Sequence, residues 1–311
     1  MYFLFLFIFF SYFPCSLDDF IWYFDFYYGN CYIFNSGKNS TTGERIESKT
    51  IARSGKYDGL ILELYAGVKN DSQTLNMNRG IHIKVHNYTN LPSTIDGINA
   101  PVGMEANIAI KRTFHYQLPY PYSECLIDLE NPSKNKITSY LYDIISNSNY
   151  SYSQVYCFDQ YYEQMVIDEC KCYDLVYVNL LEAPKPCLTM EELECSDGVF
   201  NKFINMDINR IAGSLCPLEC STISYETISS YTQFPSKTYA DVLMNKPEIV
   251  SVFKNDSNLT YEKLKENIVR INLYYESTKY TFVDESPATT IIQLLSNIGG
   301  TMGLFMVSKE F

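Results

Sequence analysis

Crowded cysteines are the feature that most constrains how this chain can fold. Eight of the ten fall within fewer than a hundred residues: Cys125, Cys157, Cys170, Cys172, Cys187, Cys195, Cys216 and Cys220. Such cysteines either hold zinc as thiolates or form disulfides. The four central ones are spaced 2, 15 and 8 residues apart, which fits poorly the two CxxC-like pairs of a zinc site. Disulfides are therefore the favoured interpretation, and no metal is expected.

Sequons for N-glycosylation favour the same interpretation. The pattern Asn-x-Ser/Thr occurs outside the segment 157–220, at Asn39, Asn70, Asn87, Asn149, Asn255 and Asn258. Glycans are added to exported surfaces, and disulfides persist in the same oxidising compartments. The sequence thus predicts an exported glycoprotein.

Charge and composition exclude two large classes of function. The net charge is -12, whereas nucleic-acid binding needs clustered Lys and Arg to neutralise phosphates, so no nucleic-acid partner is expected. The chain has three scattered histidines and no Gly-rich phosphate loop. With the cysteines committed to bridges, no pair of nucleophile and base remains to nominate, so we expect neither an enzyme nor a cofactor.

Hydrophobic periodicity predicts a mixed α+β fold. Apolar and polar residues alternate over 57–65, 80–86 and 267–276, as in half-buried strands. The spacing over 153–173 predicts a helix, and a second helix is expected to start at Thr189, with Glu191 and Glu192 in its first turn.

The two ends of the chain are apolar. Residues 1–14 carry no charge, but the run is shorter than the roughly twenty residues of a spanning helix and lacks a basic start or a cleavage site. We interpret it as a signal-like or mispredicted start. Near the other end, Ser296, Gly299, Gly300 and Gly303 would let helices approach closely. That pattern fits a pore helix or a helix interface with no ion path.

Four motifs in order resemble the degenerin/epithelial sodium channel family, which includes acid-sensing channels. They are YGNCYIFNSG at 28–37, LPYPYSEC at 118–125, the cysteine pattern from Cys157 to Cys220, and SPATTIIQLLSNIGGTMGLFM at 286–306. The resemblance covers residues 15 to about 306. It implies a channel ectodomain with a central palm β-sheet, a small β-ball and a helical disulfide-bonded thumb.

The resemblance also implies how the chain is divided and bridged. The expected divisions are an apolar start (1–14), palm, β-ball and reduced finger strands (15–124), the thumb (125–220), returning strands of the knuckle and palm (221–286) and the start of a second transmembrane helix, the pore helix (287–311). The implied nested bridges are Cys125–Cys220, Cys157–Cys216, Cys170–Cys195 and Cys172–Cys187. Cys15 and Cys31 match cysteines whose family partners lie further upstream, so they are expected to lack partners here; a Cys15–Cys31 bridge is the alternative.

Several positions gain roles by resemblance. Ser296 matches the degenerin position at the gate, Gly303 a position implicated in amiloride block, and Gly299 and Gly300 belong to the same pore-lining stretch. Tyr122 matches an aromatic at the wrist between ectodomain and membrane, and a plain turn aromatic is an equal alternative.

The implied function is a subunit of a trimeric, sodium-selective, amiloride-sensitive channel, either a homotrimer or a heterotrimer with related subunits. It would lie in the plasma membrane with most of the chain outside, and ectodomain motion would gate the pore. The family's Gly-x-Ser selectivity filter does not occur, because Val307, Ser308 and Lys309 stand there. We therefore expect a chain incomplete at both ends, lacking the filter and the first helix. The alternative is a non-conducting secreted or membrane-tethered binding module.

Overall fold

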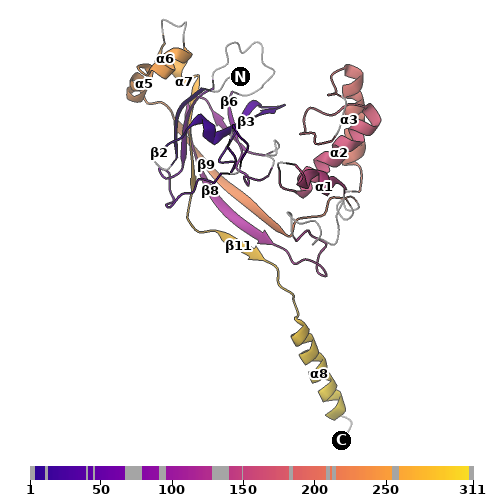
Figure 1. Cartoon of the computed structure of the whole chain (residues 1–311). Helices are drawn as coiled ribbons and strands as arrows, with labels where there is room; N and C mark the ends of the chain where they lie inside the picture. The colour runs from indigo at the N-terminus through magenta and orange to yellow at the C-terminus, as the bar shows by residue number, and fades with distance from the viewer. Residues whose placement is uncertain are drawn as a thin grey trace.

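A computed structural model describes residues 4–10, 13–39, 41–44, 46–66, 79–90, 96–127, 140–148, 150–181, 185–207, 211, 215–253 and 259–307. Over these ranges the chain has a mixed α+β fold, as the periodicity predicts. A twisted sheet lies beside a helical segment, and a C-terminal helix extends away from both (Figure 1).

The main sheet contains seven strands drawn from distant parts of the chain. In spatial order they are β11 (Thr281–Asp284), β8 (Met104–Tyr116), β10 (Ile268–Tyr275), β5 (Leu60–Tyr65), β1 (Leu4–Phe10) and β2 (Phe13–Pro14), with β9 (Ser221–Gln233) also paired to β8. Strands β10 and β11 are parallel to β8, and the other pairs are antiparallel.

Strands β8 and β9 are the longest strands of this sheet, with 13 residues each. Ala106, Ile108 and Ile110 recur at every second position and are buried, as the two-residue period of a strand requires. One edge of β8 pairs with β9 over its full length. The other edge pairs first with β10 and then with β11. A single strand therefore runs from the buried core to the segment that precedes the C-terminal helix.

Two hairpins form small separate sheets next to the main one. The first joins β3 (Phe20–Asp25) and β4 (Gly29–Phe34) after the 3-10 helix η1 (Leu17–Asp19). The second joins β6 (Gly80–Ile83) and β7 (Ile98–Pro101). Residues of the second hairpin share a hydrophobic core with β5, β8 and β10.

Strand β10 is buried on both faces. Val269 and Ile271 face the core shared with the second hairpin, whereas Ile268 belongs to a cluster with the short helices. These helices are α5 (Lys237–Met244), α6 (Pro247–Val252) and α7 (Tyr261–Lys265). Burial on both faces explains why the adjacent residues Ile268 and Val269 are both apolar, which interrupts the alternation predicted over 267–276.

The disulfide module, residues 125–220, carries helices α1 (Tyr140–Ser146), α2 (Gln154–Cys170) and α3 (Met190–Ile204) beside the sheet (Figure 1). The prediction of a helix start at Thr189 is confirmed, because Thr189 caps α3 and forms a capping box with Glu192. Helix α2 is shorter than the predicted 153–173. It ends at Cys170 because Lys171 takes the left-handed conformation (φ 61°) of a helix C-cap.

Part of the N-terminal apolar run is a strand. Residues Leu4–Phe10 form β1, paired antiparallel to β5 from Leu4 opposite Tyr65 to Phe10 opposite Leu60. Phe and Ile have high β-propensity, which favours a strand over this stretch. A short apolar run alone does not distinguish a signal-like segment from a buried strand.

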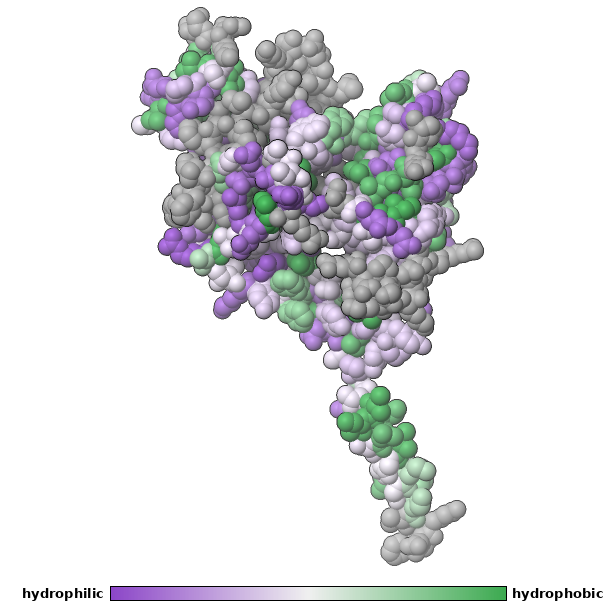
Figure 2. Space-filling view, in the orientation of Figure 1, coloured by the Kyte–Doolittle hydropathy of each residue, from purple (hydrophilic) through white to green (hydrophobic). Residues whose placement is uncertain are grey.

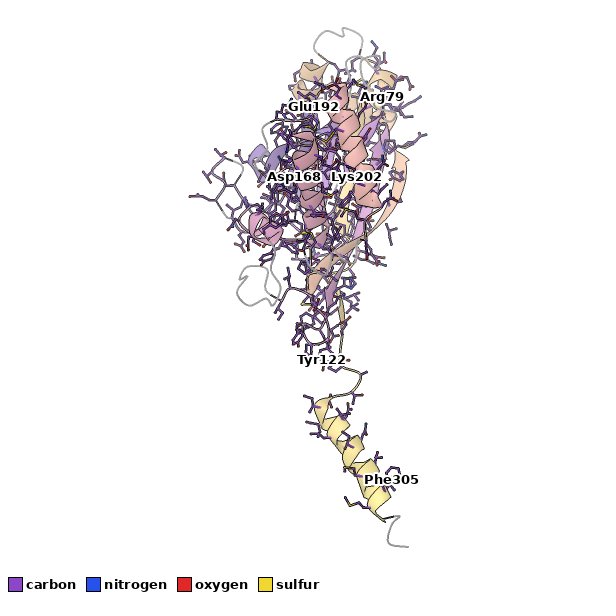
Figure 3. The ribbon with its side chains drawn as sticks, turned by 90° about the vertical axis from the view of Figure 1, so that its right-hand side faces the viewer. Arg79, Tyr122, Asp168, Glu192, Lys202 and Phe305 are labelled. Atoms are coloured by element: carbon purple, nitrogen blue, oxygen red, sulfur yellow. A yellow bond between two sulfur atoms is a disulfide. The ribbon has the colours of Figure 1, made fainter. Side chains whose placement is uncertain are left out.

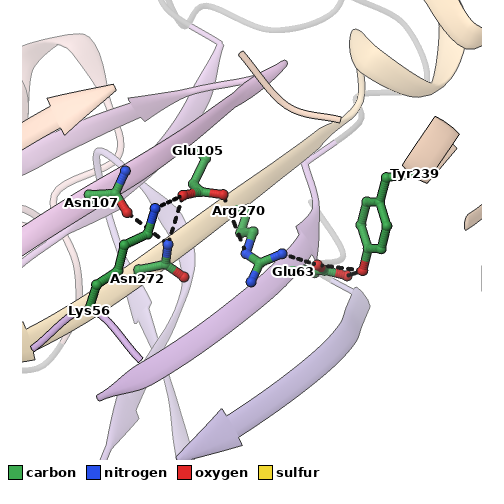
Figure 4. Close-up of polar contacts among 7 residues, drawn as sticks. All are labelled: Lys56, Glu63, Glu105, Asn107, Tyr239, Arg270 and Asn272. Carbon is green, nitrogen blue, oxygen red and sulfur yellow. Dashed lines mark hydrogen bonds and ion pairs between the residues drawn. The ribbon is translucent and has the colours of Figure 1, made fainter. Parts of the chain in front are cut away.

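Polar side chains at the centre of the main sheet form one connected network (Figure 4). On neighbouring strands, Arg270 of β10 lies opposite Glu63 of β5 and Glu105 of β8. The Arg270 guanidinium donates to Glu63 Oε1 at 3.1 Å and lies 3.6 Å from Glu105 Oε2. Tyr239 of α5 donates to Glu63 Oε1 at 2.9 Å, and Asn272 donates to Glu105 at 3.0 Å. Burial raises the pKa of Glu63, and Tyr239 and Arg270 oppose that rise.

We expect Arg270→Met to lower the free energy of unfolding by about 3 kcal/mol, the lower end of the range for removing one partner of a buried ion pair. The physical reason is that the Glu63 side chain, only 6% exposed, would keep its charge without its cation. Urea unfolding measures this loss. Lys111→Met is the matched control, because Lys111 pairs with Glu276 at an exposed position; equal losses in both variants would contradict the prediction.

Candidate functional site at the junction with the C-terminal helix

Helix α8 (Ile291–Val307) carries the four small residues that the sequence singled out: Ser296, Gly299, Gly300 and Gly303. Thr290 caps its start, because Thr290 Oγ1 accepts from the Gln293 backbone N–H at 3.2 Å and Gln293 Oε1 accepts from the Thr290 N–H at 2.9 Å. The helix extends away from the body of the protein, and green apolar residues cover much of its visible face (Figure 2).

The side chains of α8 from Ile291 to Met306 are all exposed. Ile292 and Leu304 expose 77% and 76% of their surface. In water such exposure is unfavourable by roughly 1.5 to 3 kcal/mol for each large apolar side chain, so α8 requires an apolar surrounding or a partner surface. Within the described ranges, none of the helices combines the length and the hydropathy needed to cross a bilayer.

The segment before α8 is anchored to the end of β8 by one residue, Glu285. Its backbone N–H donates to the Tyr116 carbonyl at 3.1 Å, immediately after the last β8–β11 pair. Its side chain accepts from the Leu118 backbone N–H at 3.0 Å. Glu285 therefore holds the start of the connection to α8 against residues 116–118.

The same stretch contacts the base of the disulfide module. The Gln117 backbone N–H donates to the Cys220 carbonyl at 2.7 Å, and Cys220 is bridged to Cys125. Leu126 and Cys220 add two further backbone bonds between the entering and leaving strands of the module. Residues 116–118 thus touch Glu285 on one side and the module's covalent base on the other, which makes this junction the candidate functional site.

Tyr122 lies in a turn of this junction, between the body of the protein and α8 (Figure 3). Its backbone N–H donates to the Pro119 carbonyl at 3.0 Å, and its side chain is 58% exposed. Among the described residues, no hydrogen bond or ring contact joins Tyr122 to α8. The structure therefore brings Tyr122 to the junction but does not bring it together with Ser296 or the three glycines.

The structure contains the four bridges that the resemblance implies: Cys125–Cys220, Cys157–Cys216, Cys170–Cys195 and Cys172–Cys187. The turn at Lys171 explains why neighbouring cysteines take different partners. Cys170 ends α2 and bridges to α3, whereas Cys172 lies past the turn and bridges to the segment before α3.

Cys15 and Cys31 are both free thiols in the structure, so the Cys15–Cys31 bridge is not formed. Burial raises the pKa of Cys15, and burial raises that of Cys31 to about 11. Neither side chain is then a thiolate at neutral pH, so neither is a reactive nucleophile there.

Two of the predicted glycosylation sites fall within the described ranges, Asn39 and Asn87, and both are partly exposed. Asn39 Oδ1 accepts from the backbone N–H groups of Thr41 and Thr42, which leaves the amide nitrogen that a glycan would occupy out of these bonds. The other four, Asn70, Asn149, Asn255 and Asn258, lie outside the described residues.

A buried acidic group lies inside the disulfide module. Glu163 of α2 is fully buried; its Oε2 accepts from the Asp174 backbone N–H at 3.1 Å, while Oε1 has no hydrogen-bond partner. Burial, with the nearby carboxylates of Asp174 and Asp159, raises the pKa of Glu163 to about 8. Burial likewise raises the pKa of Asp159 to about 7. Both groups favour the protonated form in the folded protein.

Sequence reasoning missed Glu285 and Gln117, which form the hydrogen bonds of the junction. Both lie directly beside segments that the family motifs contain, residues 118–125 and 286–306. The contact of Glu285 with Leu118 joins residues 167 positions apart, and Gln117 binds the carbonyl of the distant Cys220, so local sequence patterns carried no signal for either.

Comparisons with known proteins agree on one family. Residues 3–307 match the family described as "Amiloride-sensitive sodium channel". The chain is 28% identical over 295 residues to the epithelial sodium channel subunit beta-2 of Xenopus laevis, covering 94% of this chain and 43% of that protein. It is 30% identical over 297 residues to the subunit beta of Mus musculus, with 94% and 43% covered. It is also 27% identical over 299 residues to the bile acid-sensitive ion channel of Homo sapiens, with 94% and 52% covered. The chain thus spans less than half the length of these two epithelial channel subunits.

We expect the stability of the disulfide module to fall as the pH rises from about 5 to 8. In the unfolded chain the carboxyl pKa values are near 4, whereas in the folded protein they are raised to about 8 and 7 for Glu163 and Asp159. The stabilisation by the bound protons is complete below the unfolded values and is lost as the pH rises through the folded ones. Urea unfolding followed by near-ultraviolet circular dichroism measures this change.

The variant Glu163→Gln should remove at least about 2 kcal/mol of that loss, because glutamine keeps the acceptor for Asp174 and carries no charge. Glu194→Gln, at an exposed position of α3, should leave the pH dependence as in the native chain. A Glu163→Gln chain that loses stability with pH as steeply as the native one would refute the assignment.

Proposed function

This chain belongs to the amiloride-sensitive sodium channel family, and from that membership we propose that it acts as a subunit of a trimeric, sodium-selective channel in the plasma membrane, with most of the chain outside. The observation that carries the proposal is α8, an exposed apolar helix with four small residues, joined through one junction to the folded body of the protein. The family is one of ion channels rather than enzymes.

The parts of the fold take their proposed roles from this membership. The main sheet corresponds to the palm, the two small hairpin sheets to the β-ball, and the disulfide module to the thumb. The divisions are 1–14, 15–124, 125–220, 221–286 and 287–311, except that residues 4–10 join the palm as β1. Helix α8 corresponds to the start of the pore helix, with Ser296 at the gate and Gly299, Gly300 and Gly303 along the ion path.

Gating in this proposal is a movement of the disulfide module passed to α8. The module is stiff because its four bridges close segments of 95, 59, 25 and 15 residues, so it moves as a unit rather than deforming. Its base contacts Gln117, the next residues contact Glu285, and α8 begins six residues further on. Tyr122, exposed beside this path, is proposed to contact the membrane-proximal part of the channel.

Small residues on α8 support an assembly with related subunits. Ser296, Gly300 and Gly303 lie about one and two turns apart and share one face, where three helices can approach closely around an axis. Sodium ions would pass along that axis, and lipid would cover the opposite, larger side chains. Homotrimers and heterotrimers with related family members both satisfy this geometry.

The experiment that tests this function is expression of the chain in cultured cells, alone and together with related epithelial sodium channel subunits. We expect an inward sodium current that amiloride blocks, or a change in the current of the co-expressed subunits, together with glycosylated protein at the cell surface. Secretion of the chain, with no current and no effect on co-expressed subunits, would favour the non-conducting binding module instead.

We expect Glu285→Ala to weaken the coupling between the body and α8, since it removes the side-chain acceptor of the Leu118 N–H. An exposed hydrogen bond to a charged group stabilises by about 1 kcal/mol, so the open probability should shift about fivefold at unchanged surface expression. Single-channel recording measures the shift. Glu285→Gln keeps an acceptor oxygen and should shift it less, and Asp284→Ala is the neighbouring control; equal effects from all three would contradict the assigned role.

A further inference from the structure

A large cavity lies between the main sheet and the two hairpins, away from the junction. Its volume is about 830 Å³, within the range of roughly 300 to 1,000 Å³ typical of small-molecule sites. One wall is the sheet, through β5 and β10; the other walls are the β3–β4 hairpin and β6, which lie near the sheet in Figure 1. The turn that follows β10, residues 277–279, lines one end.

The walls of the cavity suit a flat apolar body. Tyr28 of the first hairpin and His82 of β6 stack face to face with ring centroids 4.0 Å apart and planes within 6°. Leu62 of β5 and Leu273 of β10 line the sheet side. Such a surface favours aromatic or alicyclic rings, which gain contact area without hydrogen bonds.

The charge of the lining is opposite to the charge of the protein. The chain carries -12, yet the cationic residues that line the cavity are Lys49, Arg79, Lys84, Arg112 and Lys279. Asp25 is the single carboxylate among the lining residues, and its Oδ1 already accepts from the backbone N–H groups of Tyr27 and Tyr28. An acidic protein thus concentrates positive charge around one enclosed space.

Two of these cationic side chains form ion pairs with carboxylates of the protein. Lys49 pairs with Asp19 at 3.0 Å, and Lys84 pairs with Asp96. By contrast, within the described ranges Arg112 and Lys279 pair with no carboxylate. Arg112 Nε is buried and has no hydrogen-bond partner.

These two cations come from neighbouring stretches of the main sheet. Strand β11 pairs with β8 from Thr281 opposite Thr113, so Arg112 and Lys279 lie one and two residues before that pair. The Arg112 guanidinium carbon is 4.8 Å from the ring centroid of Phe114 and 5.9 Å from those of Tyr275 and Tyr280. A carboxylate beside these stretches would meet two cationic side chains while the rest of its molecule lay among the apolar walls.

We propose that this cavity binds an organic anion that carries a carboxylate on a flat apolar ring system. Lys279 and Arg112 bind the carboxylate, and the rings lie between the Tyr28–His82 stack and the sheet. A charge-assisted hydrogen bond is about twice as strong as a neutral one, so the carboxylate distinguishes this ligand from neutral molecules of the same shape. The proposal concerns binding alone and does not depend on whether the chain conducts ions.

A matched pair of ligands tests the proposal directly. 1-Naphthaleneacetate and 1-naphthaleneacetamide share ring system and size and differ in the charge of one group. In isothermal titration calorimetry on the whole disulfide-bonded chain in lipid nanodiscs, with empty nanodiscs as the blank, we expect the acetate to bind at least about tenfold more tightly than the amide.

The variant Lys279→Gln should weaken acetate binding about tenfold and leave amide binding unchanged, because it removes charge and keeps a donor. Lys279 is exposed, so folding should be preserved, and an unchanged thermal midpoint checks this. Arg112→Gln should have the same selective effect. Lys111→Gln, one residue from Arg112 and absent from the lining, is the control and should alter neither affinity.

Three results would overturn the proposal. One is equal affinity of the acetate and the amide, which would indicate an apolar site without anion recognition. Another is a loss of acetate binding in Lys111→Gln as large as in Lys279→Gln, which would indicate general electrostatic attraction. The third is no binding of either molecule at millimolar concentration.

Discussion

The bridge between Cys125 and Cys220 is the constraint on which the rest of the architecture depends. It closes a segment of 95 residues, and in the loop-closure model such a bridge stabilises by about 4 to 5 kcal/mol. Its position matters more than its energy. The bridge joins the segment that enters the disulfide module to the segment that leaves it. At the same point, the Gln117 backbone N–H donates to the Cys220 carbonyl. Without it, the segments that enter and leave the module would be held together here by backbone hydrogen bonds, such as that from the Leu126 N–H to the Leu218 carbonyl, and by no covalent link between Cys125 and Cys220.

Strand β8 carries the consequence of that bridge across the molecule. It pairs with β9 along one edge, and with β10 and then β11 along the other, so its last residues lie between the module and the connection to α8. The polar network of Arg270, Glu63 and Glu105 holds the opposite part of the same sheet, where β5, β10 and β8 meet. A displacement at the base of the module therefore acts on β8, whose far end is held by the polar network. Of the segments next to β8, the one that leads to α8 has fewer contacts with the sheet.

The sequence predicted the parts of this structure that depend on local chemistry. The α+β class and the capped start of α3 at Thr189 follow from periodicity and capping residues, and the resemblance to the channel family is confirmed by the match over residues 3–307. The missed features depend on pairing between distant segments. Residues 4–10 form a strand because they pair with the edge of β5. Strand register determines the partners of Arg270, and the role of Glu285 follows from its contact with Leu118. Ser296 lies on α8 and Tyr122 at the junction, where the family motifs place them. Their roles stay predictions, because each role depends on what surrounds α8, and the body of the protein does not provide those surroundings.

Helix α8 presents two unlike faces, and each requires a different neighbour. At 100° per residue, Ser296, Gly300 and Gly303 lie within a narrow arc, whereas Leu294, Ile298 and Phe305 lie on the opposite side. The larger side chains expose 51%, 48% and 71% of their surface, which is unfavourable in water but not in hydrocarbon. The small-residue face exposes backbone, which gains most from another helix at close range and least from lipid. The two faces therefore differ in the neighbour that stabilises each most: an apolar medium for the larger side chains, and another helix at close range for the small-residue face.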